Sequence, residues 1–257
     1  MAGMSDFDLS TVDRLLSTTR AVRKRLDLER EVPEDVILDC IRLSQQAPTG
    51  SNMQNWRWLV VRDPDKRAAL ADLYRQAGGD YLAAAAESGA LVAASTTDET
   101  GSRRPGARSR PAARRRGGSH GARTAAGGRV ADGKNKRVMS SATYLAEHLA
   151  EVPVHVIPCA KGRLTGDDVG MWSGMLGSIY PAVWSFQLAL RSRGLGSCLT
   201  TLHLGKEAEA AALLGIPDDV MQIALLPVAY TIGTDFKPAD RGPVERIVHV
   251  DSWGNKP

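Results

Sequence analysis

The feature that most constrains this chain is a stretch that cannot contribute to a globular core. Gly101–Arg129 holds nine Arg, seven Gly and six Ala, and no aliphatic or aromatic residue larger than alanine. Such a segment buries too little apolar surface to offset its ordering entropy. We therefore expect one domain over residues 1–257, interrupted at 98–136 by an Arg/Gly/Ala-rich insert. The insert is either disordered or the out-of-frame translation of a GC-rich gene.

The positive net charge of +4 comes from the same region. Residues 101–137 contain twelve basic residues and one acidic residue, whereas the rest of the chain has twenty-one basic and twenty-eight acidic residues. Basic arms can bind nucleic acid through its phosphates, but this one lacks interleaved aromatics and a basic body to act with. A nucleic-acid partner is therefore disfavoured. No apolar run approaches the roughly 18 to 20 residues that cross a bilayer, and no signal peptide is recognisable, so we expect a cytoplasmic protein without membrane contact.

Hydrophobic periodicity and turn residues predict helices and strands in irregular alternation, which favours an α+β fold over a doubly wound parallel sheet. A capping box of Ser10 and Asp13 should start the first helix. The expected helices are 10–18, one opening at Pro33, 63–76, 81–94, 139–150, 178–193 and 207–214. The expected strands are 58–61, 152–158, the near-continuous apolar run 222–230, and 244–250. The three cysteines are widely spaced and are expected to be buried thiols.

Two N-terminal segments carry groups suited to an anionic, planar ligand. Thr18–Arg25 contains Arg20 and Arg23, and Arg offers a planar fork of donors that suits phosphate. Taken alone, a charge run after a helix is more often a solvated surface. The turn Ala47–Gln54 offers hydroxyls, amides and backbone N–H groups, although a capped loop of this composition is also ordinary.

Two later segments are weak signals when read separately. Gly194–Thr201 holds a lone Gly-x-Gly that follows a helix, so it is not a dinucleotide-binding fingerprint. The segment Lys237–Pro243 carries Arg241, which could be a phosphate ligand or a surface cation. The five histidines show no metal-ligand spacing, so we expect no metal site.

In combination, these segments resemble the nitroreductase family of FMN enzymes, and within it an actinobacterial-type branch. The resemblance covers about residues 9–93 and 137–253. It is carried by the motifs T-T-R-A-V-R-K-R-L, A-P-T-G-S-N-M-Q, S-A-T-Y-L-A-E-H, L-A-L-R-S-R-G-L-G-S-C and L-L-P-V-A-Y-T.

The resemblance implies an α+β homodimer with a mixed central sheet surrounded by helices, and two FMN sites built from both subunits. Arg20 and Arg23 would hold the phosphate and ribityl region, and Arg241 the phosphate. The residues expected at the flavin ring are Pro48, Thr49, Gly50, Asn52 and Gln54 from the partner subunit, and Leu199, Thr200 and Thr201. Departures from the family pattern are Ala21 for a common Ser, Asn55 for Pro, and Ala239 for a frequent Lys that Lys237 would replace.

The function implied is ping-pong transfer of hydride from NADPH or NADH through FMN N5 to a nitroaromatic, quinone or similar small acceptor. The cofactor supplies this chemistry, so no catalytic side chain is expected. Three alternatives remain open: an FMN-fold protein with flavin-storing or other specialised chemistry, a nucleic-acid-interacting protein acting through the insert, and a cofactor-free remnant.

Overall fold

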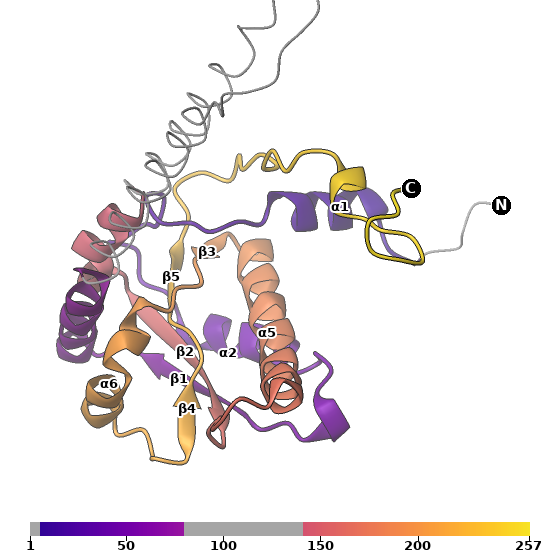
Figure 1. Ribbon diagram of the computed structural model, residues 1–257. Coiled ribbons are helices and arrows are strands. Elements are labelled where there is room, and N and C mark those ends of the chain that lie inside the picture. Colours follow the sequence, from indigo (N-terminus) through magenta and orange to yellow (C-terminus); the bar gives the residue numbers. More distant parts are fainter. Residues whose placement is uncertain (1–5, 80–140) are drawn as a thin grey trace, which may run out of the picture.

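The computed structural model describes residues 6–79 and 141–257. The helix expected at 81–94 and the insert at 98–136 lie outside the described residues. Segments on the two sides of this gap share one sheet, because β1 (Trp56–Val61) pairs along its length with β2 (Val154–Lys161). The two parts of the chain therefore form one structural unit (Figure 1).

The sheet contains three further strands, and its order is β1-β2-β5-β3. Here β3 is Leu195–Ser197 and β5 is Leu226–Tyr230, while β4 (Val220–Gln222) pairs with the end of β2. All pairings between these strands are antiparallel, and the one parallel pairing among the described residues is an isolated bridge between Gly162 and Val220. The α+β fold class is confirmed, whereas the expectation of a mixed sheet is corrected to an antiparallel one.

The single strand expected at 222–230 is divided into β4 and β5 by a bulge. Gln222 pairs with Cys159 and Leu226 pairs with Val156, so the later strand has one residue more than β2 between these pairs. A bulge bends its strand and increases the local twist. The apolar run predicted the burial of this segment correctly but carried no signal for the extra residue.

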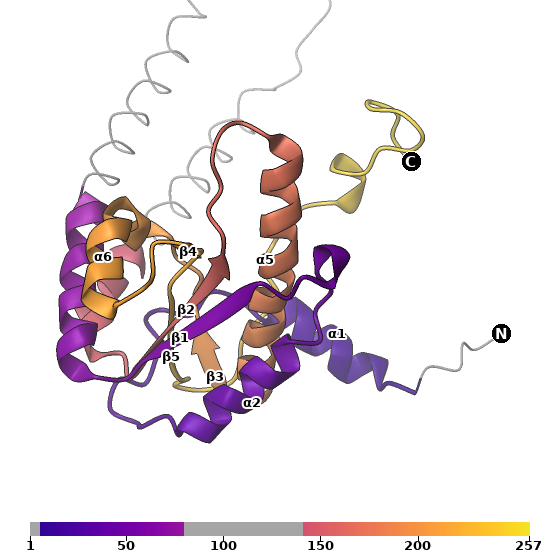
Figure 2. The same cartoon turned by 90° about the horizontal axis from the view of Figure 1, so that it is seen from below.

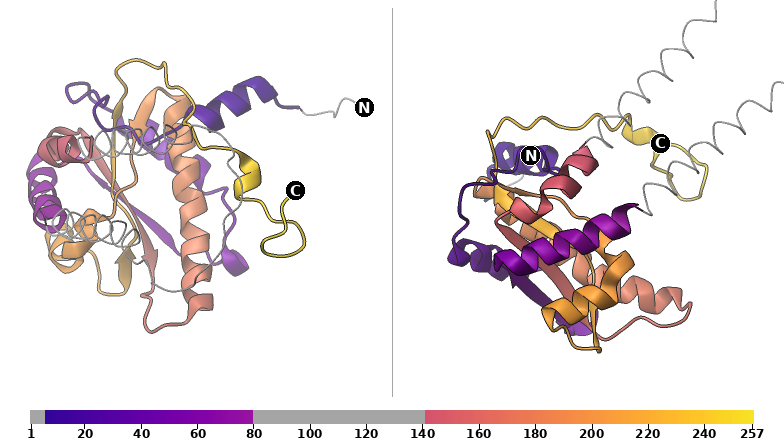
Figure 3. Two further views of the ribbon diagram at one scale, coloured as in Figure 1. Left: turned by 45° about the horizontal axis from the view of Figure 1, so that its top comes forward. Right: turned by 90° about the vertical axis from the view of Figure 1, so that its left-hand side faces the viewer.

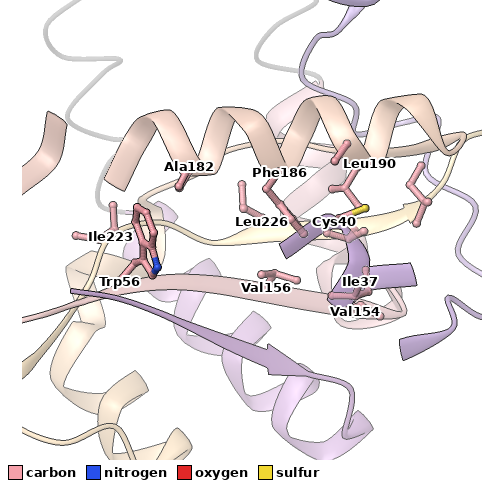
Figure 4. Close-up of a cluster of buried hydrophobic side chains, with 14 of the residues drawn as sticks. Ile37, Cys40, Trp56, Val154, Val156, Ala182, Phe186, Leu190, Ile223 and Leu226 are labelled. Carbon is pink, nitrogen blue, oxygen red and sulfur yellow. The ribbon is translucent and has the colours of Figure 1, made fainter. Parts of the chain in front are cut away.

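Helices cover both faces of the sheet (Figures 2 and 3). One face carries α2 (Glu34–Ser44) and α5 (Val169–Ser192), and the other carries α6 (Glu207–Leu214) and the helical residues 64–79 and 141–148. Figure 4 shows the first core, in which Phe186 and Leu190 of α5 lie over the aliphatic side chains of β2 and β5. Burying such side chains contributes about 1.5 to 3 kcal/mol each.

The central helix α5 begins nine residues before its expected start at Ser178. Asp168 caps it, because the Asp168 carboxylate accepts a 3.0 Å hydrogen bond from the backbone N–H of Met171. The first half of α5 holds three glycines, and Pro181 follows at its midpoint; both residue types lower helix propensity. Packing against the sheet stabilises α5 from Ser178 onward, whereas residues 169–174 of its first half are exposed.

The ends of two other helices test the capping predictions. In α1 (Leu9–Thr18) the cap is Asp8, whose carboxylate accepts from the backbone N–H of Ser10 at 3.1 Å. The predicted capping box of Ser10 and Asp13 was therefore wrong, since an acidic cap lies two residues earlier. Helix α6 ends as predicted at Gly215, which has the left-handed φ of 68°.

The C-terminal segment is not the strand expected at 244–250. It forms a short 3-10 turn at Val244–Arg246 and extends away from the sheet (Figures 1 and 2). Adjacent Ile247 and Val248 break the strand-like alternation, and no strand of the described chain pairs with them. Ile247 is left 79% exposed. Within the described residues, no helix is long and apolar enough to cross a membrane.

Candidate functional site

The segment after α1, residues 20–27, lies against β3 and the end of β5, which lead into Leu199–Thr201 and into the segment of Arg241. The backbone N–H of Val22 donates to Ser197 O of β3 at 2.9 Å, and Asp27 N–H donates to Tyr230 O of β5 at 2.8 Å. Leu26 forms a bridge with Thr231, just beyond the end of β5. Residues 20–27 therefore run along the edge of the sheet, where β3 leads into Leu199–Thr201.

Gly196 permits this close approach. A methyl group at Gly196 would lie 2.7 Å from Cγ2 of Thr231 and 3.0 Å from Cβ of Val22. Both distances are too short for carbon atoms in ordinary contact. The Gly-x-Gly signal therefore reflects packing between the N-terminal segment and β3, which agrees with its rejection as a dinucleotide fingerprint.

Arg23 and Leu199–Thr201 line one cavity of about 600 Å³. Arg23 is half-buried, and Thr200 is fixed because its backbone N–H and C=O both pair with Leu225, at 3.0 and 2.8 Å. Two of the predicted segments thus meet in one cavity. Its other walls come from the ends of the helices next to the gap in the described chain and from the turn after Thr201: Tyr74, Arg75, Ala77, Gly78, Gly79, Ala142, Ala146, Leu202 and Gly205.

A group of polar side chains, which includes Tyr74, Thr200, Cys198 and Arg23, lies at this cavity. The Tyr74 hydroxyl and Thr200 Oγ1 are 3.0 Å apart. Burial raises the pKa of Tyr74, and it raises the pKa of the Cys198 thiol to about 11, although the nearby Arg23 guanidinium acts to lower both. Tyr74 and Cys198 are therefore neutral near pH 7, and Arg23 carries the positive charge of this group.

Arg20 links the N-terminal segment to the C-terminal motif. Its Nη1 donates a 2.9 Å hydrogen bond to the backbone oxygen of Lys237, so the segment that carries Arg241 comes next to Arg20. Arg20, Ala21 and Arg241 are all exposed. The hydrogen bond joins two segments that carry exposed cations, which could accept an anionic group such as phosphate.

The turn motif lies elsewhere on the same chain. The backbone N–H of Gly50 donates to Ser178 Oγ at 3.0 Å, which places the turn against the middle of α5. Helix α5 covers the face of the sheet opposite to the helical residues 64–79 and 141–148, which form walls of the cavity, and no residue of the turn lines that cavity. Pro48, Thr49, Gly50, Asn52 and Gln54 therefore do not join Arg23 within one chain.

The turn is also conformationally unusual. Ser51, Asn52 and Gln54 have left-handed φ values of 51°, 53° and 47°. Such values are uncommon outside glycine and are maintained at a cost of about 1 to 3 kcal/mol each when the surroundings fix them. Gln54 Nε2 donates to Asn52 Oδ1 at 2.9 Å, which ties the two amides together. The exposed, preshaped turn is suited to contact another surface.

The described residues contain no group of three or more His, Cys, Asp or Glu side chains placed to hold a metal ion. His155 and His203 are fully buried, and burial lowers the pKa of each to about 4. His155 Nε2 bonds to Leu149 O at 2.8 Å, whereas neither ring nitrogen of His203 has a partner in the described chain.

Sequence reasoning missed the wall that Tyr74, Arg75 and the glycines at 78 and 79 provide. Tyr74 fits the apolar period of its helix and gave no functional signal. The Gly78-Gly79 pair at a helix end was the available signal, because paired glycines there remove side chains from a surface.

The fold is similar to that of solved flavoproteins. A BluB-like flavoprotein from Clostridium difficile 630 has a TM-score of 0.59 and 17% identity, over 92% of this chain and 97% of that chain. Iodotyrosine deiodinase bound to FMN and 3-iodo-L-tyrosine has a TM-score of 0.59 and 19% identity, over 94% and 100%. An FMN- and NADPH-dependent nitroreductase from Sphigopyxis sp. strain HMH has a TM-score of 0.58 and 18% identity, over 94% and 99%.

No curated protein matches the chain. The model of the nitroreductase family matches residues 16–230, which include the N-terminal arginines, the turn, the sheet and Leu199–Thr201. The match covers most of the sequence. The chain therefore belongs to the nitroreductase family.

Proposed function

We propose that the protein is an FMN-dependent oxidoreductase that uses NADPH or NADH to reduce a nitroaromatic, quinone or similar small acceptor. The observation that carries the proposal is the cavity shared by Arg23 and Leu199–Thr201, two segments far apart in sequence. Family membership and the similarity to an FMN- and NADPH-dependent nitroreductase support it. The wording of the motifs supports the actinobacterial-type branch.

The residues fit FMN in charge and in hydrogen-bonding groups. Arg20, Lys237 and Arg241 belong to two segments joined by a hydrogen bond, and they provide cations for the phosphate. Arg23 provides a donor for the phosphate and ribityl region, and the hydroxyls of Thr200 and Thr201 provide donors for the polar edge of the ring. No acidic residue of the described chain lines the cavity. Bound FMN would supply the redox chemistry, accepting hydride from the nicotinamide and passing electrons to the acceptor.

The role of the protein in this scheme is to bind and orient. Arg23 is half-buried, and electrostatic interactions in such a place are stronger than in water. The backbone of Thr200 is fixed by Leu225, so its side chain is held in position before a ligand arrives.

We also propose a homodimer in which the partner's turn completes each site. Trp172, Tyr180 and Trp184 recur at multiples of four along α5, so they share one helix face. They are 39%, 36% and 43% exposed. Such an exposed apolar stripe, together with the exposed C-terminal segment, favours contact between copies. The dimer would bring residues 48–54 of a second copy to the cavity.

Reduction of the purified protein under anaerobic conditions tests the proposal. A yellow preparation that releases FMN on denaturation should lose its colour with NADPH or NADH and regain it with a quinone or nitroaromatic. A yellow protein that dithionite reduces but neither nicotinamide does would refute the reductase assignment. It would favour the alternative of an FMN-fold protein with other chemistry. The similarity in fold to iodotyrosine deiodinase and to a BluB-like flavoprotein supports this alternative.

The phosphate assignment has a separate test. Arg20→Ala and Arg241→Ala should each weaken FMN binding, because each removes a charge-assisted contact worth about 1.5 to 3 kcal/mol. Arg42→Ala is a matched control, since Arg42 pairs with Asp39 on the exposed side of α2, away from the cavity. Unchanged FMN affinity in both single variants and in their combination would remove the assigned roles.

A further inference from the structure

Tyr74 is a buried polar residue that the proposed cofactor contacts do not explain. It lies in the helical residues 64–79, is 2% exposed, and lines the cavity that contains Arg23 and Thr200. Its hydroxyl is 3.0 Å from Thr200 Oγ1. The rest of its ring packs in the core that faces α6.

Either hydroxyl of this pair can donate, and burial of the phenol favours Tyr74 as the donor. Burial raises the pKa of Tyr74, so the phenol keeps its proton. A buried O–H without an acceptor costs about 1 to 3 kcal/mol, and Thr200 Oγ1 is the acceptor at hydrogen-bond distance. A hydroxyl can accept and donate at the same time. If Thr200 accepts from Tyr74, its own proton is free to point into the cavity.

We propose that Tyr74 is a positioning residue, which orients the Thr200 hydroxyl so that Thr200 donates a hydrogen bond to the polar edge of the flavin. This inference rests on the proposed function, because it assigns an orientation to a residue of the same site. Thr200 is suited to the role, since Leu225 already holds both of its backbone polar groups. The hydroxyl is therefore the polar group that Thr200 can offer to a ligand.

The expected effect is on the balance between oxidised and reduced cofactor. Reduction places more negative charge on the flavin edge, and hydrogen bonds to charged acceptors are roughly twice as strong as neutral ones. The donor should therefore favour binding of reduced over oxidised FMN by about fivefold, given a net hydrogen-bond contribution near 1 kcal/mol. For a two-electron couple this ratio corresponds to about 20 mV in midpoint potential.

The experiment measures the FMN dissociation constant and the two-electron midpoint potential in matched variants. Tyr74→Phe and Thr200→Val each remove one hydroxyl with little change in shape, and Thr200→Ser keeps the hydroxyl. Tyr230→Phe is the control, because the Tyr230 ring stacks with Arg30 outside the cavity. We expect Tyr74→Phe, Thr200→Val and the double variant to lower the potential by the same roughly 20 mV. Thr200→Ser and Tyr230→Phe should keep the wild-type potential.

A general loss of packing would lower thermal stability and FMN affinity without this pattern in the potential. An unchanged potential in Tyr74→Phe, or additive shifts in the double variant, would overturn the proposal. If Tyr74→Phe does not fold, equal potentials for Thr200→Val and Thr200→Ser would overturn it, and a drop confined to Thr200→Val would support it. Wild-type protein that binds no FMN would refute the proposed function as well, so failures of the two are distinguishable.

Discussion

Gly196→Ala should destabilise the protein, because the N-terminal segment lies directly over this position. The new methyl group would lie 2.7 Å from Cγ2 of Thr231 and 3.0 Å from Val22. Overpacking of this kind costs about 1 to 3 kcal/mol, and reduced freedom of the unfolded chain returns about 0.4 to 1 kcal/mol. We expect a net loss of about 1 to 2 kcal/mol in the free energy of unfolding.

Thr231→Ser provides the matched rescue. It removes Cγ2 and keeps Oγ1, which bonds to Gly194 O at 3.2 Å and to Gly233 O at 2.9 Å. The double variant Gly196→Ala/Thr231→Ser should recover about half of the lost stability, because the contact with Val22 remains. The recovery identifies the clash as the cause.

The assay is urea denaturation of the cofactor-free protein, followed by circular dichroism, with wild type and Thr231→Ser as references. FMN affinity is measured in the same four proteins. It should fall in Gly196→Ala, because displacement of Val22 also moves Arg23. A Gly196→Ala protein as stable as wild type, or a loss that Thr231→Ser leaves unchanged, would refute the account of the N-terminal segment.

Three further predictions concern other parts of the chain. His155 and His203 have pKa values near 4 in the folded state, below their usual 6.5, so stability should be full above pH 6.5 and fall as the pH decreases towards 4. Urea denaturation at several pH values measures this, and equal stability at pH 7 and pH 4.5 would contradict it. Trp184→Glu should yield a monomer with weakened FMN binding in light scattering and flavin titration, and a dimer of normal affinity would argue against the α5 interface. Asp168→Ala should cost about 0.5 to 2 kcal/mol of stability by removing the α5 cap; an unchanged urea midpoint would show that the cap contributes nothing.

Elements with a strong local signal could be predicted from the sequence. The α6 helix ends at Gly215 as expected, and the burial of residues 222–230 was correct. Elements fixed by tertiary packing could not be predicted. The β3 strand contains the glycine that the packing of Val22 requires. The exposed first half of α5 was also missed, because its three glycines give a weak helix signal.

The candidate site was also predictable from the sequence only in part. The motifs predicted that residues 20–23, 199–201 and the segment of Arg241 belong together, and the structure brings them close through hydrogen bonds at Val22 and Arg20. Tyr74 carried no signal, because a tyrosine on a buried helix face has the same pattern whether or not its hydroxyl reaches a cavity. The expected C-terminal strand was wrong, because its apolar residues pair with no strand of the described chain and Ile247 is exposed.

Titration of the folded, purified chain with FMN tests the central claim most directly. The account predicts saturable binding of one FMN per chain, with flavin fluorescence quenched and the dimer retained throughout. Loss of binding in Arg23→Ala, with unchanged circular dichroism, should accompany it. A folded wild-type protein that stays colourless after incubation with excess FMN would contradict the account.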